Sequence, residues 1–133
     1  MSQSNNTSLK YKLLWLSLGY LMVLFVIYSS LSTSDVVLDI KLSDKLMHVL
    51  GYFALMSWFM QIYHGRRAVF FLALVFIVLG IALEFLQGLG GVRYFEVADM
   101  FANTLGVLLG WALSYTSVAR ILLWFERSLG VAH

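Results

Sequence analysis

Cysteine and proline are both absent from the 133 residues, and charged side chains are scarce. Without cysteine the chain has no disulfide framework, no thiolate metal site and no cysteine nucleophile. Without proline, the kinked or discontinuous helices of transporters are not indicated. Charged residues make up 12% of the chain and hydrophobic ones 61%, whereas a soluble domain carries about 25% charged residues. The composition therefore excludes an ordinary soluble domain and favours an integral membrane protein.

Four apolar runs follow one another, over residues 13–31, 46–63, 68–86 and 97–115. Each is close to the ~20 residues that a helix needs to cross ~30 Å of hydrocarbon. Strands are disfavoured, because alternation is missing and the runs are twice the length of a barrel strand. Short connections, one of them the glycine-rich residues 88–91, predict antiparallel neighbours. The predicted fold class is all-α, a polytopic membrane protein of four transmembrane helices arranged as two antiparallel hairpins.

The two ends of the chain allow more than one interpretation. Residues 1–12 are predicted to be a cytoplasmic tail, residues 13–117 the membrane domain and residues 118–133 a C-terminal segment. The first run also resembles a secretory signal peptide, but it is long for one and no Ala-x-Ala site follows, so retention as a membrane helix is expected. In the last segment Trp124 and the spacing of Arg120 and Arg127 predict an interfacial helix. A plain extension of the fourth helix is the alternative.

The distribution of Lys and Arg predicts the orientation. If the four runs span the bilayer in order, one side holds Lys10, Lys12, Arg66, Arg67, Arg120 and Arg127, and the other holds Lys41, Lys45 and Arg93. The richer side is expected to be cytoplasmic, which places both termini there.

Polar residues gather at the opposite, extracytoplasmic ends of the runs. This one-sidedness predicts a site made from Asp44, Lys45, His48, Glu84, Gln87, Arg93, Glu96, Asp99 and Asn103. Asp44 and His48 share one helix face, so the carboxylate could fix the imidazole tautomer, although Asp44 alone also suits a helix start. Glu84 opposes the dipole at the end of its own helix and lies among apolar residues, which favours a functional role shared with Gln87 on the same face.

The loop and the fourth run carry further candidates. Arg93 could bind a phosphate or carboxylate, or pair with a neighbouring acid. Asp99, Asn103, Gly106 and Gly110 form one helix stripe, and its glycines predict a close packing seam.

The starts of the second and fourth runs are similar to each other. Residues 44–51 read Asp-x-x-x-His-x-Leu-Gly and residues 99–106 read Asp-x-x-x-Asn-x-Leu-Gly. Two hairpins related by a pseudo-two-fold axis along the membrane normal would bring Asp44, His48, Asp99 and Asn103 together. A chance match remains the alternative, because Leu is common in apolar helices.

These residues also carry a family resemblance. Asp44-Lys45-x-x-His48, then Glu84-x-x-Gln87, Arg93, and Asp99-x-x-x-Asn103-Thr-x-Gly106 resemble the VanZ-like family over residues 43–111. The resemblance implies a small bacterial membrane protein of the cell envelope, multi-pass in the cytoplasmic membrane. The founding member is associated with low-level resistance to the glycopeptide teicoplanin, and no biochemical activity is implied.

Three functions remain open from the sequence. In the first, the polar site binds an anionic lipid headgroup or a lipid-linked envelope precursor, with Lys45 and Arg93 as anion contacts. In the second, the chain is a hydrolase or transferase acting on an envelope lipid. It would use either a divalent metal held by Asp44, His48, Glu84 and Asp99 or direct acid–base catalysis by residues such as His48, Glu84 and Asp99. In the third, the cluster is an internal staple of a structural module, which could self-associate through the Gly106–Gly110 seam. No cofactor is predicted beyond that metal, and no nucleic acid.

Overall fold

All regular structure in the described part of the chain is helical, as predicted. The computed structural model describes residues 8–32, 41–91 and 94–131. The long helices are α1 (Lys12–Leu31), α2 (Lys41–Ile62), α3 (Arg66–Leu89) and α4 (Val97–Leu113). A short 3-10 helix, η1 (Ser117–Arg120), leads into α5 (Ile121–Ser128). The four apolar runs thus correspond to the four long helices, and α1, α2 and α3 each begin before the run that predicted it.

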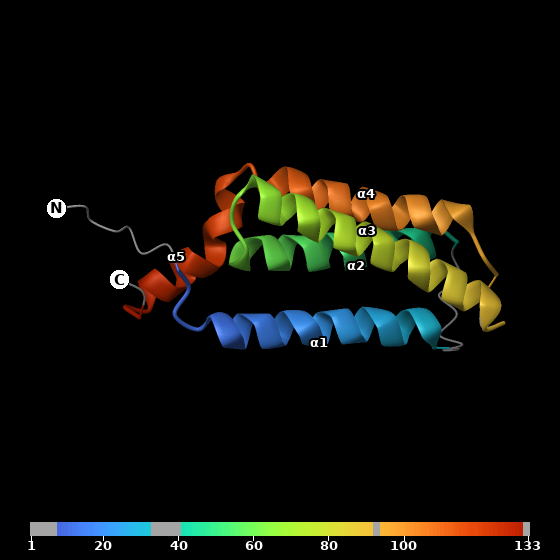
Figure 1. Cartoon of the computed structure of the whole chain (residues 1–133), viewed down its shortest axis with the longest axis horizontal. Coiled ribbons are helices and arrows are strands. Elements are labelled where there is room, and N and C mark those ends of the chain that lie inside the picture. The colour runs from blue at the N-terminus through green and yellow to red at the C-terminus, as the bar shows by residue number, and fades with distance from the viewer. Residues whose placement is uncertain (1–7, 33–40, 92–93, 132–133) are drawn as a thin grey trace.

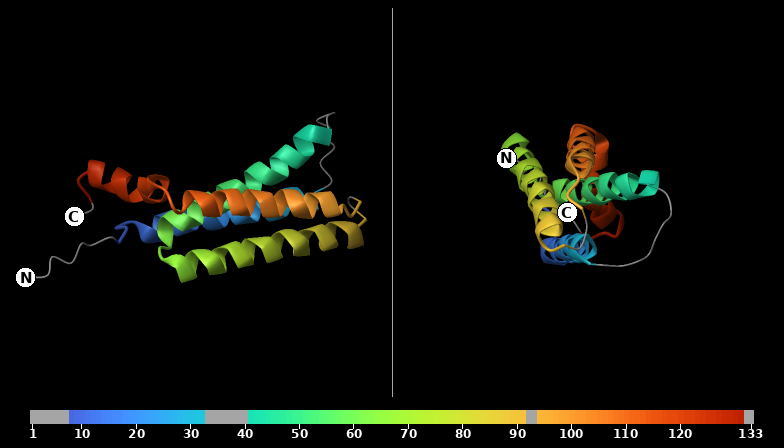
Figure 2. Two further views of the ribbon diagram at one scale, coloured as in Figure 1. Left: turned by 90° about the horizontal axis from the view of Figure 1, so that it is seen from above. Right: turned by 90° about the vertical axis from the view of Figure 1, so that its right-hand side faces the viewer.

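The long helices form an elongated bundle with two distinct poles (Figure 1). At the terminal pole α1 and α3 begin, α2 and α4 end, and α5 lies beside the start of α1. At the distal pole α3 ends and α4 begins. Helices α2, α3 and α4 pack together while α1 lies along one side, and the first turns of α2 diverge from the bundle axis (Figure 2).

Length and composition support only part of the predicted four membrane crossings. Helices α1 and α3 are long and apolar enough to span a bilayer, and α4 with the C-terminal helices makes a third span only if the pair, bent by 77°, is taken as one. Helix α2 is less apolar because Lys45, His48 and Gln61 interrupt it, and α4 has only 17 residues. The described structure thus supports two or three spans by length and composition, and not clearly four.

The tightest contact in the bundle joins α2 to α4 through glycine. A Cβ atom added at Gly106 would lie 2.3 Å from the carbonyl oxygen of Val49, and one at Gly110 would lie 2.7 Å from Cβ of Met56. Only glycine allows two helix backbones to come this close. Next to this seam the fully buried Leu55 and Met56 form the centre of the core.

Helix α1 is fastened to the bundle at both poles. At the distal pole Gln87 Nε2 donates a 2.5 Å hydrogen bond to the carbonyl oxygen of Ser30 in the last turn of α1. At the terminal pole the completely buried Glu126 of α5 accepts hydrogen bonds from Lys10 N at 2.7 Å, Tyr11 N at 3.0 Å and Trp15 Nε1 at 2.7 Å. A carboxylate suits the N-terminus of a helix, where unpaired N–H groups and the dipole favour negative charge.

The surroundings of Glu126 also act on its protonation. Burial alone would raise the pKa of this carboxyl, but the hydrogen bonds from Trp15, Tyr11 and Lys10 outweigh it and hold the pKa below its usual range. The ionised carboxylate therefore joins α5 to the start of α1.

Apolar side chains cover the outside of the long helices. Leu13 and Phe25 of α1, Phe71 and Val78 of α3, and Phe101 of α4 are all 60% or more exposed. Exposed apolar area this extensive is uncommon on soluble proteins and suits contact with lipid chains.

Candidate functional site

The polar cluster predicted from the sequence lies at the distal pole, between the first turns of α2 and α4. Asp44, Lys45 and His48 come from α2, and Asp99 and Asn103 come from α4. Each set repeats at one helical turn, so its side chains share the face that meets the other helix. The glycine seam below holds the two backbones close enough for these side chains to meet across the interface.

Lys45 connects the cluster to the α3–α4 connection. Its Nζ atom lies 2.8 Å from Asp99 Oδ1 and 2.9 Å from Glu96 Oε2. The Asp99 side chain is only 6% exposed, whereas those of Lys45 and Glu96 are 40% and 53% exposed. The ammonium therefore neutralises part of the charge of a buried carboxylate and fixes one of its two oxygens.

The imidazole of His48 is oriented by a hydrogen bond to Asn103 of α4. Its Nδ1 atom lies 2.9 Å from Asn103 Oδ1, and Asn103 Nδ2 donates a long 3.5 Å hydrogen bond to the carbonyl oxygen of Gly80. Because the amide nitrogen faces Gly80, its oxygen faces the imidazole, and Nδ1 must carry the hydrogen. The Nε2 atom of the neutral ring is then the acceptor, with its lone pair directed away from Asn103.

Two carboxylates face that Nε2 atom. It lies 3.7 Å from Asp99 Oδ2 and 3.9 Å from Asp44 Oδ2, and all three atoms fit within 4.8 Å of one another. The His48 side chain is 11% exposed and that of Asp44 is 38% exposed, so the group opens outward on the Asp44 side. Three acceptor atoms converging on one point is an arrangement suited to a cation.

Glu84 does not join this group in the structure. It is 1% exposed, and its Oε1 atom accepts a 2.8 Å hydrogen bond from the backbone N–H of Glu96, the residue that precedes α4. Its charge opposes the dipole at the end of α3 but complements the dipole at the start of α4. The centre of the cluster is therefore His48 with Asp99, and Glu84 holds the start of α4 against α3.

Two of the remaining predicted residues, Gln87 and Arg93, are not seen in the cluster. Gln87 points to Ser30 of α1 rather than into the cluster. Arg93, predicted with Lys45 as an anion contact, lies outside the described residues. The four residues grouped by comparing residues 44–51 with residues 99–106 do meet, and His48 and Asn103 at equivalent positions are hydrogen-bonded to each other.

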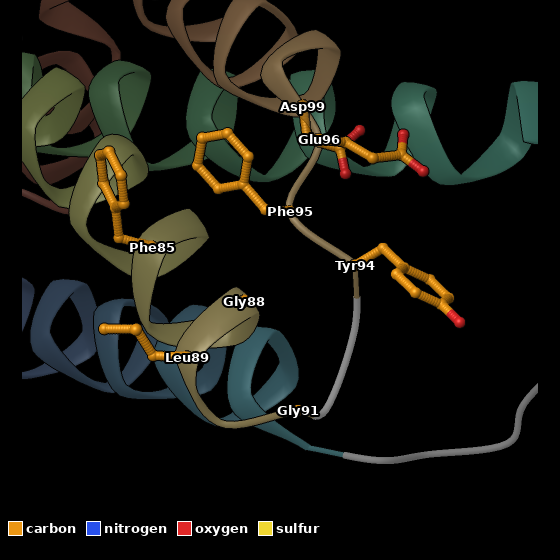
Figure 3. A pocket seen from close by; sticks show the side chains of 8 residues that line it. All are labelled: Phe85, Gly88, Leu89, Gly91, Tyr94, Phe95, Glu96 and Asp99. Atoms are coloured by element: carbon orange, nitrogen blue, oxygen red, sulfur yellow. The ribbon is translucent and has the colours of Figure 1, made fainter.

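An open cleft adjoins the cluster along the α3–α4 connection. It has a volume of about 840 Å³, and Phe85, Leu89 and Phe95 contribute apolar walls while Glu96 and Asp99 contribute carboxylates. In Figure 3 the Phe85 and Phe95 rings lie beside each other, and the Tyr94 side chain points away from them. The centroids of the two phenylalanine rings are 5.1 Å apart. Asp99 belongs to both the cleft and the polar cluster, so a bound molecule could contact an apolar wall and the charged groups together.

Sequence reasoning missed several residues that matter here. The Phe85–Phe95 pair gave no signal, because aromatic residues are common throughout the chain. Glu126 did give a signal in the sequence, because it is an acidic residue on the apolar side of a short helix. Tyr52 follows His48 by one helical turn, so it lies on the same face of α2, and its buried hydroxyl has no hydrogen-bond partner among the described residues. Its ring and the Asn103 amide both approach Gly80.

Comparison with known proteins places the chain in a family. Neither curated proteins nor solved structures include a significant match. A family model described as VanZ/LLP1 matches residues 2–122. The match includes the first helix and the start of α5, both outside the range over which the sequence motifs carried the resemblance. With nearly the whole chain covered, this protein belongs to the VanZ/LLP1 family.

Proposed function

We propose that the distal pole is a binding site for an envelope lipid or a lipid-linked cell-wall precursor. The observation that carries the proposal is the cleft, which joins an apolar wall to the carboxylates of Glu96 and Asp99 within one open space, with the Lys45 ammonium bound to both carboxylates beside it. An amphiphile has both kinds of surface. Its hydrocarbon part would lie on Phe85, Leu89 and Phe95, and its headgroup would meet Lys45, Glu96 and Asp99.

The charges suggest how the headgroup is recognised. An ammonium has three donors, and two of those on Lys45 are directed to Asp99 and Glu96. The third donor is suited to a phosphate or carboxylate oxygen, and Arg93 is the expected second contact. Glu96 and Asp44, both partly exposed, are suited to accept hydrogen bonds from sugar hydroxyls.

We also propose a membrane topology that places this site on the extracytoplasmic face. Helices α2 and α4 pack lengthwise against α3, which is apolar enough to span a bilayer, so they would cross it as well and give four crossings. Arg66 and Arg67 begin α3 at the terminal pole, and Arg120 ends η1 there. This excess of basic residues would keep the terminal pole and both termini in the cytoplasm and expose the distal pole on the other face of the bacterial cytoplasmic membrane. Helix α5 would lie at the cytoplasmic surface.

Lipid retention by purified protein tests the binding proposal. The full chain, in nanodiscs, would be offered phosphatidylglycerol or a polyprenyl phosphate, and bound lipid would be counted by native mass spectrometry. We expect Phe95→Ser and Arg93→Ala each to reduce retention several-fold. Phe71→Ser is the matched control, because Phe71 is an exposed aromatic of α3 that does not line the cleft. Equal retention by the Arg93→Ala variant and the unaltered chain would contradict the proposal.

A lipid hydrolase or transferase is the second candidate, because an imidazole between two carboxylates can act as a general base. Turnover of the same lipids by the purified chain, lost in His48→Ala, would favour it. If a cell-wall precursor is the ligand, overproduction should change teicoplanin susceptibility in a His48-dependent manner, and an unchanged susceptibility would argue against that ligand.

A further inference from the structure

We propose that Asp44, His48 and Asp99 together bind one divalent metal ion, of the zinc or manganese class, beside the cleft. This inference rests on the proposed function and adds to it a metal ion that would contact the lipid headgroup. The ion itself is inferred from the protein atoms alone.

The distances fit an ion better than direct contact between the side chains. His48 Nε2 is 3.7 Å from Asp99 Oδ2 and 3.9 Å from Asp44 Oδ2, and hydrogen bonds between such groups span about 2.7–3.2 Å. An imidazolium hydrogen would therefore reach neither oxygen well. Ligands about 2.1 Å from a tetrahedral zinc ion lie about 3.4 Å from one another, so each imidazole–carboxylate distance is within a few tenths of an ångström of that value. The two carboxylate oxygens, which lie within 4.8 Å of each other, would draw together around the ion, and the half-exposed Asp44 side chain is placed to move.

Two of the proposed ligands, His48 and Asp99, are already oriented by a contact at the atom that would not bind the metal. Metal-binding imidazoles usually donate their second N–H to a carbonyl or carboxylate oxygen, and His48 Nδ1 is directed to Asn103 Oδ1 at 2.9 Å. Asp99 likewise has Oδ1 bound to Lys45, which leaves Oδ2 facing the imidazole. These contacts orient both ligands before any ion arrives.

The charges near the three ligand atoms also suit a cation. Two of those atoms are carboxylate oxygens, from Asp44 and Asp99, and both lie within 4 Å of the same imidazole nitrogen. A divalent ion between them would offset the repulsion between two neighbouring carboxylates. One imidazole with two carboxylates favours zinc or manganese over magnesium, which prefers oxygen ligands alone.

Three protein ligands leave coordination positions open. The Asp44 side is partly exposed, and an ion there would present a water molecule or a phosphate oxygen toward the cleft. This use of the ion rests on the proposed function. It would explain how a cleft lined by the carboxylates of Glu96 and Asp99 recognises an anionic headgroup.

Metal titration of the full chain tests the site directly. The protein would carry a histidine-free affinity tag, be stripped with EDTA, and be dialysed against Zn²⁺ or Mn²⁺ before elemental analysis by mass spectrometry. We expect one ion per chain for the unaltered protein and an affinity at least about tenfold lower for His48→Gln. His64→Gln is the matched control, because His64 is an exposed histidine between α2 and α3, at the terminal pole. Asp44→Asn, a change at a partly exposed residue, replaces His48→Gln if that variant does not unfold cooperatively.

The outcomes separate the ion from the lipid. No bound metal in the unaltered chain, or an equal loss in the His48 and His64 variants, would overturn the site. Metal binding with EDTA-sensitive lipid retention supports both proposals. If the chain binds metal but retains the same amount of lipid with and without EDTA, the metal site is supported and only its role in headgroup recognition is overturned.

Discussion

His48 of α2 and Asn103 of α4 face each other across the helix interface, with Nδ1 and Oδ1 2.9 Å apart. Asn103 is itself positioned by the carbonyl oxygen of Gly80 in α3, so three helices determine how one imidazole is oriented. The glycine at position 80 leaves room for this contact, because a Cβ atom there would lie 3.0 Å from Cβ of Asn103 and would press the Asn103 side chain away by a few tenths of an ångström.

The imidazole of His48 should be held in the Nδ1–H tautomer. We expect ¹⁵N spectra of histidine-labelled, metal-free protein to show this tautomer, and Asn103→Leu to lose the preference because the acceptor is gone. Asn103→Asp keeps an acceptor oxygen and should preserve it. An Nε2–H tautomer in the unaltered chain would contradict this orientation.

Alanine at Gly106 should destabilise the bundle, because the added methyl group would collide with the carbonyl oxygen of Val49 at 2.3 Å. Overpacking of this kind costs about 1–3 kcal/mol. Gly51→Ala is the matched control on α2, where nothing lies within 4 Å of the added atom, and it should be neutral or slightly stabilising. Thermal unfolding in detergent compares the two, and equal melting temperatures would refute the seam.

Glu84→Ala should lower stability more than metal affinity. The change leaves the partly buried N–H of Glu96 without the carboxylate oxygen that now accepts from it at 2.8 Å, a loss of about 1 kcal/mol. Glu84→Gln retains an acceptor oxygen and should lose less. Unfolding and metal titration on the same samples decide the matter: a Glu84→Ala variant that folds normally but fails to bind metal would place Glu84 among the ligands.

The stabilisation from Glu126 should depend on pH. Because the pKa of this carboxyl is lowered in the folded protein, its contribution is complete above the usual glutamate pKa of about 4.3 and is lost as the pH falls through the lower folded value. Glu126→Gln should therefore melt at a lower temperature than the unaltered chain at pH 7, and the gap should narrow below about pH 4. A gap that stays constant from pH 7 to pH 3 would show that the carboxylate charge is not what fastens α1 to α5.

Local patterns predicted much of the fold and the grouping of the site. Apolar runs give the helices, because each must bury its backbone polar groups within itself in a membrane. The spacing of Asp44 with His48 and of Asp99 with Asn103 fixes which side chains share a face. What local spacing could not give is the role of Glu84, whose partner belongs to the next helix, or the tether from Glu126 to α1, whose partners lie more than a hundred residues away in the chain.

The sequence by itself determined an all-helical membrane protein with a polar cluster at one end, because composition and helical periodicity are local properties. Only the tertiary structure decided the centre of that polar end. The close approach of α2 and α4 at Gly106 and Gly110 sets His48 against Asp99 and turns Glu84 toward the start of α4. Distances between side chains on different helices depend on how the helices pack, and that is a property of the whole bundle.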